Sequence, residues 1–324
     1  MDRGPGIVTL TVVSRVAAGL ATLLLVIGLG FVLLELMPGD AAQLAEDPSL
    51  SAEDRERLRS AFGLDRPPLE RFLTFASHAL RGDLGISLSY QRPVRRVLLT
   101  ALWPTLLLTG SALVIAFALG LGLGTLAAAR GGGLVDRVVR QVLPALDAMP
   151  PFWLGLLAIY VFSWKLDWLP ASHMTSVGEG AGGLFDRLTH LLLPVLVLGI
   201  PSAAPVARHH AEAMRRELAS AYSHAASAMG LRRARVIASA ARNAMHPALT
   251  LLGLALPAMV GGAVVVEVVF SWPGLGQVHQ KALLARDIPL ALGGLLLIGG
   301  MVIAGGLASD LLSALLDPRW RRRA

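Results

Sequence analysis

The sequence contains no cysteine and almost no lysine. Without a thiol, the chain cannot form disulfides, bind a metal through thiolates or use a cysteine nucleophile. All but two of its 29 basic residues are arginine, the exceptions being Lys165 and Lys281. No G-x-x-x-x-G-K-[ST] pattern occurs, which excludes ATP binding through a P-loop. The eight histidines are scattered and no H-E-x-x-H pattern occurs, so we expect no metal site.

Charged residues are scarce as well, at 16%, whereas 54% of the residues are hydrophobic and the mean hydropathy is +0.62. This composition is typical of a membrane-embedded chain with short polar connections. In a soluble protein the net charge of +7 would suggest a nucleic-acid partner. Here arginines that retain loops in the cytoplasm explain it better, and we expect no nucleic-acid partner.

Six apolar stretches approach or exceed the length of about 20 residues that crosses a bilayer core. We therefore predict an all-α membrane protein with about six transmembrane helices, forming a single domain over residues 1–324. The predicted spans are Val16–Leu36, Pro104–Ala129, Leu143–Trp164, Leu188–Ala207, Pro247–Phe270 and Pro289–Ala308.

The distribution of arginine predicts how these spans are oriented. With the N-terminus inside, the cytoplasmic segments hold 16 basic residues and the two short outside loops hold four. The loop after the first span is long, and its nine arginines, matched by nine acids, carry little weight. Both termini of a multi-pass inner-membrane protein are therefore predicted to be cytoplasmic.

The long outside segment, residues 37–103, is predicted to be periplasmic. It opens with the helix stop Met37-Pro-Gly-Asp40, and a short helix is expected over Ala52–Phe62. The run Gly82-Asp-Leu-Gly85 is expected to break the segment again. A net-neutral loop of this size suits either a docking surface for a soluble partner or a solvated cap.

The cytoplasmic segment, residues 208–246, carries a helical pattern with small side chains. Met214, Leu218, Tyr222, Ala225 and Met229 are spaced by three or four residues, which predicts one amphipathic helix. Gly230 is expected to end that helix, and a second, arginine-rich helix is expected from Arg232 to Asn243. Because the middle of the first helix is rich in Ala and Ser, we expect it to enter a groove on a partner protein rather than lie on lipid.

Two further features lie within the spans. Gly120, Gly124 and Ala128 follow a small-xxx-small spacing, which predicts close helix packing, either within the chain or between subunits. Glu267 is the outstanding acid within a span. It is expected to line a pathway, to form a structural hydrogen bond with the turn that follows it, or to lie exposed at the membrane surface.

Several motifs together resemble the permease subunits of dipeptide, oligopeptide and nickel ABC importers. The cytoplasmic signature runs from Tyr222 through Gly230-Leu231 to Asn243 and Pro247. Other family-like stretches follow the family order along nearly the whole chain: Met37-Pro-Gly-Asp40, Gly63-Leu-Asp-Arg-Pro67, Gly82-Asp-Leu-Gly85, Glu267-Val-Val-Phe-Ser-Trp-Pro-Gly-Leu-Gly276, Arg286-Asp-Ile-Pro289 and Asp317-Pro-Arg319. Two positions depart from the signature, with His224 where Glu is frequent and Met229 where a basic residue precedes the glycine.

The resemblance implies a type I importer permease fold and a coupling helix that docks on a cytoplasmic ATPase. Its candidate coupling residues are Ala219, Tyr222, Ala225, Ala226, Met229 and Gly230, and the candidate pathway or gate residues are Glu267, Ser271, Trp272, Pro273 and Gly274. It also implies a second, homologous permease as a heterodimer partner, a periplasmic binding protein, and ATP and Mg bound by the ATPase subunits rather than by this chain. The chain is thus expected not to be an enzyme.

Short peptides are the expected substrate, with nickel or another small solute as the alternative within the same family. Two other classes remain. A secondary transporter would show inverted repeats and charges at the membrane midplane, which are not evident in the sequence. An intramembrane protease would need a dyad such as Ser111 with His190, although a serine beside a glycine is more typical of helix packing.

Overall fold

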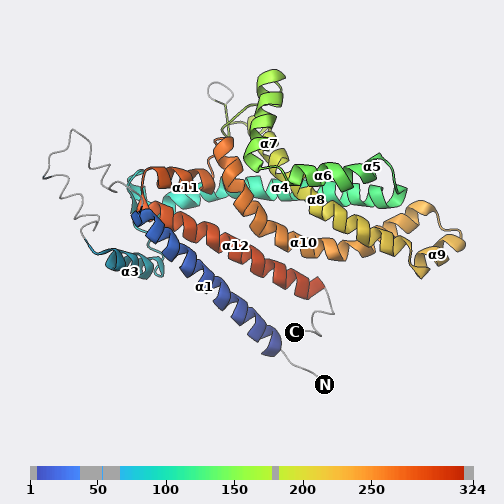
Figure 1. Cartoon of the computed structure of the whole chain (residues 1–324), viewed down its shortest axis with the longest axis horizontal. Helices are drawn as coiled ribbons and strands as arrows, with labels where there is room; N and C mark the ends of the chain where they lie inside the picture. The colour runs from blue at the N-terminus through green and yellow to red at the C-terminus, as the bar shows by residue number, and fades with distance from the viewer. Residues whose placement is uncertain (1–5, 37–52, 54–65, 177–181, 317–324) are drawn as a thin grey trace. The chain divides into compact units, whose positions relative to one another are not determined.

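The computed structural model describes residues 6–36, 53, 66–176 and 182–316, which are almost entirely helical (Figure 1). The expected helix over Ala52–Phe62 falls outside the described residues, apart from Glu53. The elements are α1 (Gly6–Leu36), α3 (Pro68–Ala79), β1 (Ile86–Ser87), β2 (Arg92–Pro93), α4 (Val94–Arg130), α5 (Leu134–Arg137), η2 (Val138–Val142), α6 (Leu143–Asp147), α7 (Pro151–Ala158), η3 (Ile159–Lys165), α8 (Leu184–Leu218), α9 (Ala221–Ala228), α10 (Arg233–Val269), α11 (Leu275–Leu284) and α12 (Ile288–Leu316).

Four of the expected spans are confirmed as long apolar helices. They are Ser14–Leu36 in α1, Val94–Arg130 in α4, Leu184–Leu218 in α8 and Ile288–Ala308 in α12. Helix α4 begins ten residues before the expected span, so the segment between α1 and α4 is shorter than predicted. A helix pairs most of its backbone groups within itself, which suits it to crossing hydrocarbon, and the prolines inside α4 and α8 are tolerated in such helices.

The third expected span, Leu143–Trp164, is not one straight helix, and its place as a single span stays a prediction. The structure places two helical segments there, Leu134–Asp147 and Pro151–Lys165, bent by 103°. Consecutive prolines explain the break. Pro150 has extended backbone angles, φ −59° and ψ 132°, because the proline that follows it disfavours a helical conformation.

The fifth expected span, Pro247–Phe270, lies almost wholly within α10, which begins at Arg233 and so also contains the expected arginine-rich helix. Helix α10 runs without a break for 37 residues, from Arg233 into the apolar segment Pro257–Val269. The arginine-rich stretch and the apolar stretch are therefore one rigid rod. By length and composition, the described residues contain four membrane-crossing helices, or five if the bent pair counts as one.

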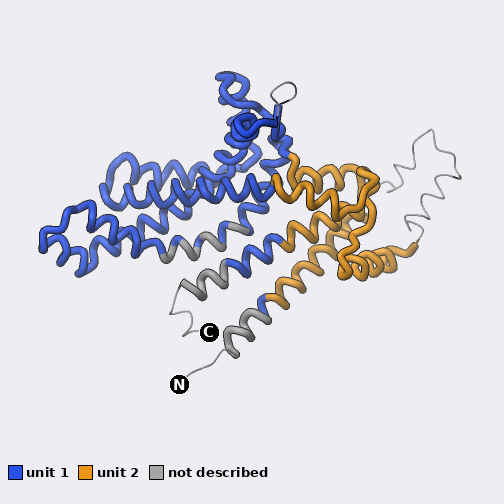
Figure 2. The backbone as a smooth tube through the Cα atoms, turned by 180° about the vertical axis from the view of Figure 1, so that it is seen from behind, with its two compact units in different colours: residues 1–15, 105–272, 301–324 blue, residues 16–104, 273–300 orange. Residues whose placement is uncertain are grey.

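The chain divides into two compact units (Figure 2). In the unit comprising residues 1–15, 105–272 and 301–324, α8 lies along α4 and α10 and supplies much of the core. The small-xxx-small residues of α4 pack within the chain, as one of the two readings predicted. A Cβ on Gly120 would lie 2.6 Å from Val206, and one on Gly124 would lie 2.7 Å from the Ala207 carbonyl oxygen. Only glycine permits such a close approach of α4 and α8.

The other unit comprises residues 16–104 and 273–300 and packs α12 against its neighbours through glycine. A Cβ on Gly293 would lie 2.8 Å from Val94, at the start of α4. On α11, His279 lies against Gly294, where a Cβ would approach its Nδ1 atom to 2.7 Å. Burial lowers the pKa of His279, against the effect of a backbone hydrogen bond with Ala291, so the ring is neutral at pH 7.

Asp287 is a fully buried acid of this second unit, and its hydrogen bonds link several elements. Its backbone N–H donates to the Ala282 carbonyl (2.9 Å) and closes α11. Its Oδ1 accepts from the backbone N–H of Leu290 (3.2 Å) and caps α12. Its Oδ2 accepts from the Ser87 hydroxyl (2.5 Å) and the Ser89 backbone N–H (2.9 Å), beside the β1–β2 hairpin. The carboxylate therefore joins the start of α12 to the hairpin, while the backbone of the same residue closes α11.

Replacing Asp287 by Ala should lower the melting temperature of the detergent-solubilised protein by several degrees, roughly 2–8 °C. The change removes a helix cap and leaves buried donors without an acceptor, which costs about 1–3 kcal/mol. Tryptophan fluorescence during heating measures the effect. Glu70→Gln is the matched control, because that carboxylate is half exposed in a surface ion pair with Arg66. Equal melting temperatures for the two variants would contradict this role of Asp287.

Candidate functional site

A short helix, α9, forms the corner between the long helices α8 and α10 (Figure 1). The sequence predicted a single helix through Met214 and Met229, and this was wrong. Helix α8 ends at Leu218, and Ser220 is extended, with φ −74° and ψ 155°. The hydroxyls of Ser220 (2.5 Å) and Ser223 (2.8 Å) both donate to the Glu217 carbonyl, which satisfies the exposed end of α8.

The end of α9 is formed by Gly230, as predicted. Gly230 has φ +80°, in the left-handed region that glycine adopts without strain. Its N–H donates to the Ser227 carbonyl (3.1 Å), and the N–H of Leu231 donates to the Ala226 carbonyl (3.1 Å). These two bonds make a Schellman motif, which sets the direction in which α10 leaves the corner.

A triangle of side chains links α9 to both long helices. The Tyr222 hydroxyl donates to Glu217 Oε2 on α8 (2.7 Å). Asn243 of α10 donates through Nδ2 to the Tyr222 oxygen (3.1 Å) and to Glu217 Oε2 (3.4 Å). Tyr222 was predicted as a surface contact, whereas Glu217 and Asn243 were not singled out. Their link depends on how three helices meet, which no local pattern encodes.

Most of the candidate coupling residues share an exposed position at this corner. Met229 is 74% exposed and Tyr222 is 41% exposed. Ala219, Ala225 and Gly230 are exposed, and Ala226 is half-buried. Ser223, in contrast, is buried and faces the protein. The helix thus presents two larger side chains separated by alanines, a shape suited to entering a groove.

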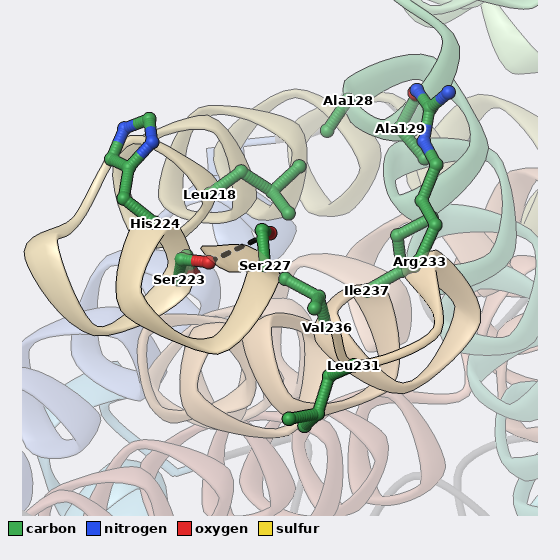
Figure 3. A pocket seen from close by; sticks show the side chains of 10 residues that line it. All are labelled: Ala128, Ala129, Leu218, Ser223, His224, Ser227, Leu231, Arg233, Val236 and Ile237. Atoms are coloured by element: carbon green, nitrogen blue, oxygen red, sulfur yellow. Dashed lines mark hydrogen bonds between the residues drawn. The ribbon is translucent and has the colours of Figure 1, made fainter. Parts of the chain in front are cut away.

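A cavity of about 480 Å³ opens beside α9 (Figure 3). The lining residues come from the end of α4, from α8, α9 and the start of α10: Ala128, Ala129, Leu218, Ser223, His224, Ser227, Leu231, Arg233, Val236 and Ile237. Arg233 donates to the Ala129 carbonyl (3.0 Å) and so ties the start of α10 to the end of α4. His224, the departure from the family signature, stands across the cavity from Arg233.

A buried ion pair supports the same end of α8. Asp136 of α5 is only 8% exposed and accepts from Arg215 Nη2 at 2.6 Å. Arg140, one helical turn further along, lies 3.0 Å from the same carboxylate. The sequence analysis missed Asp136, although its spacing of four from Arg140 was a visible signal for an ion pair.

Glu267, the candidate pathway acid, is fully buried near the end of α10. Its Oε1 accepts a hydrogen bond from the Thr105 hydroxyl of α4 (2.6 Å). Thr105 is 3% exposed, and the sequence analysis did not identify it as a partner. In this conformation the carboxylate braces two helices rather than facing solvent.

The turn that follows Glu267 holds the other pathway candidates. Ser271 has φ +50°, and the Trp272 N–H donates to the Glu267 carbonyl (2.8 Å). Trp272 is fully buried, Gly274 is buried, Ser271 is half-buried and Pro273 is exposed. The candidate pathway residues therefore differ in solvent exposure, and only part of the turn is open to solvent.

Comparison with known proteins identifies the family. Residues 120–322 match the family described as binding-protein-dependent transport system inner membrane component. The chain is 36% identical over 318 residues to the di/tripeptide transport system permease protein DppB of Pseudomonas aeruginosa, covering 91% of this chain and 94% of that protein. It is 32% identical to the oligopeptide transport system permease protein AppB of Bacillus subtilis, covering 95% and 98%.

A third relative has a different named substrate. The glutathione transport system permease protein GsiC of Escherichia coli K12 is 34% identical over 311 residues, covering 96% of this chain and 98% of that protein. The match thus extends over nearly the whole length of each protein. The chain belongs to the family of binding-protein-dependent transport system inner membrane components, the permease subunits of ABC importers.

Proposed function

We propose that this chain is the permease of an ATP-driven importer for di- and oligopeptides and forms half of the translocation pathway. The observation that carries the proposal is the α9 corner. This exposed helix has small side chains, its first turn is hydrogen-bonded to α8 and α10, and its end is closed by the Gly230 turn. Such a helix can transmit motion of an attached protein directly into two long helices.

We propose six spans with both termini in the cytoplasm. The four long apolar helices, the bent pair and the apolar part of α10 supply them. This arrangement puts the α9 corner on the cytoplasmic side, where its seven surrounding arginines, Arg208–Arg242, favour retention. The segment between α1 and α4 then faces the periplasm.

The partners follow from the family and from this orientation. Cytoplasmic ATPase subunits, which bind ATP and Mg, dock on α9 through Tyr222, Ala225, Met229 and their neighbours. A homologous permease completes the pathway, and a periplasmic binding protein delivers the substrate. Peptides are the proposed substrate, since the named relatives carry di/tripeptides, oligopeptides and glutathione.

The Ser271–Gly274 turn is proposed to border the pathway. Glu267 is proposed to hold the turn in place rather than to contact the substrate. Exposed Pro273 marks the side of the turn that substrate could reach. The Glu267 carbonyl fixes the turn, and its carboxylate is bonded to Thr105. Burying a carboxyl group within a membrane span costs free energy, and the hydrogen bond from Thr105 offsets part of that cost.

Replacing Ala225 by Arg should reduce capture of the cognate ATPase by the tagged permease about tenfold or more, equivalent to a loss of about 1.4 kcal/mol in binding. The bulky charge would occupy the exposed small face of α9. Co-purification from cells that express the whole importer measures it. Ala238→Arg, at an exposed alanine of α10, is the matched control. Undiminished capture by the Ala225 variant would remove α9 as the docking helix.

Replacing Tyr222 by Phe should lower peptide uptake about fivefold while ATPase capture stays unchanged, because a hydrogen bond is worth about 1 kcal/mol. The ring keeps its contact surface, but the hydroxyl that joins Glu217 and Asn243 is lost. Uptake into proteoliposomes and ATPase capture are measured on the same preparation. The control is Tyr160→Phe, since Tyr160 is 51% exposed on η3. A parallel fall in capture would show that Tyr222 serves binding rather than transmission.

Replacing Glu267 by Gln should leave folding and peptide uptake within about twofold of the wild type, because the amide oxygen still accepts from Thr105. Glu267→Leu should instead lower the melting temperature, since it removes the acceptor from a buried hydroxyl. Melting and uptake together test this. If the Gln variant melts normally but loses uptake, the prediction is wrong and the negative charge of Glu267 is needed for transport.

A further inference from the structure

Helix α3 and its C-cap residue, Leu80, carry an apolar stripe that the described part of the chain leaves uncovered. Leu69, Leu73 and Leu80 are 69%, 57% and 90% exposed. They follow a spacing of four and seven residues, which places them on one face with Ala76. Charged and polar residues, including Glu70, His78 and Arg81, occupy the other side. The helix is therefore amphipathic, with part of its apolar side open.

The remainder of the apolar side fixes α3 against the end of α1. Phe72 packs against Phe31, with ring centroids 5.4 Å apart. Arg71 pairs with Glu35 at 3.1 Å, and its guanidinium lies 6.0 Å from the Phe31 ring centroid. Both α1 residues lie within the last six positions of the span Ser14–Leu36. These contacts place α3 at the level where that span leaves the hydrocarbon core (Figure 1).

The end of α1 beside α3 is itself apolar and exposed. Leu29, Val32, Leu33 and Leu36 are between 52% and 73% exposed at the same end of the span. In a membrane, exposed apolar residues of a span face lipid. A neighbouring helix with bare leucines at the same level, and charges on its other side, matches the pattern of helices that lie in the membrane–water interface.

We infer that α3 is an interfacial helix that inserts Leu69, Leu73 and Leu80 into the border of the lipid acyl chains. The orientation under Proposed function makes this the outer leaflet, and only the choice of leaflet rests on that proposal. The helix then anchors the long segment between α1 and α4 at the membrane surface. Arg71 and Phe72 hold α3 to α1, so the helix itself would keep a constant depth.

The absence of cysteine permits a direct test in the full-length protein. Leu73→Cys, labelled with the fluorophore NBD and placed in a lipid nanodisc, should be quenched by a doxyl group near the head of the acyl chain. A doxyl group near the chain end should quench less, and aqueous iodide should quench roughly threefold less than at a polar-face site. His78→Cys is that matched site, because His78 lies on the polar face of the same helix.

A second labelled site, Leu69→Cys, shows whether lipid contact at Leu73 reflects the whole stripe or a local folding defect. Gel filtration confirms that each variant is monodisperse. Agreement of Leu69 and Leu73 in lipid quenching supports the inference. Strong quenching by iodide at both sites overturns the inference, because the leucines would then face water. Relief of that quenching by added binding protein would not restore it. Protection from both iodide and lipid quenchers also overturns it, since the stripe would then be covered by protein.

This readout needs neither transport nor an ATPase, so failure of the proposed function leaves the lipid contact testable. In sealed proteoliposomes, dithionite outside the vesicle identifies the leaflet, after the orientation is fixed by a tag at the C-terminus. Reduction of NBD on the side opposite the C-terminus supports the outer leaflet. Reduction on the same side overturns the leaflet assignment but not the lipid contact.

Discussion

The architecture depends on satisfying the last carbonyl groups of its helices, which have no partner within the helix. Among the described residues, four helix ends use the same arrangement, a residue with positive φ followed by an N–H that reaches back to a carbonyl five positions earlier. These residues are Gly82 after α3, Gly230 after α9, Ser271 after α10 and Arg286 after α11. Glycine adopts this conformation freely, whereas Ser271 and Arg286 do so at a cost of about 1–2 kcal/mol each. Satisfying buried carbonyls outweighs that cost, so these sharp corners persist between rigid rods.

Local chemistry made much of the architecture predictable. Four spans, the stop at Gly230, the break at Gly82–Gly85 and the packing glycines of α4 follow from length, glycine and small-residue spacing. The break before Ser220 was missed, because the three- and four-residue spacing of apolar positions continues across it. The bend at Pro150 lay inside an apolar run that looked long enough to cross the membrane. Composition alone cannot separate one span from two short segments.

The polar contacts were beyond prediction for a different reason. Thr105 and Glu267 are 162 positions apart, and Ser87 and Asp287 are 200 apart. Any hydroxyl on a neighbouring helix could have met either acid, and helix packing selects the partner. The sequence shows that burying Glu267 in a membrane costs free energy, but it does not show which group forms the hydrogen bond that offsets this cost. The same holds for Glu217 and Asn243, whose roles appear only once α8, α9 and α10 are assembled.

Two short helices, α9 and α3, are both exposed and both carry apolar residues, yet their side chains suit different surroundings. Alanine and serine on α9 offer little area to lipid but allow close approach of another backbone, so a protein groove recovers more contact there. Leucines on α3 bury far more apolar area, and their lack of polar neighbours on that stripe suits a medium without hydrogen-bonding groups. Side-chain size, more than hydrophobicity as such, is therefore the basis on which we propose a protein groove for α9 and lipid for α3.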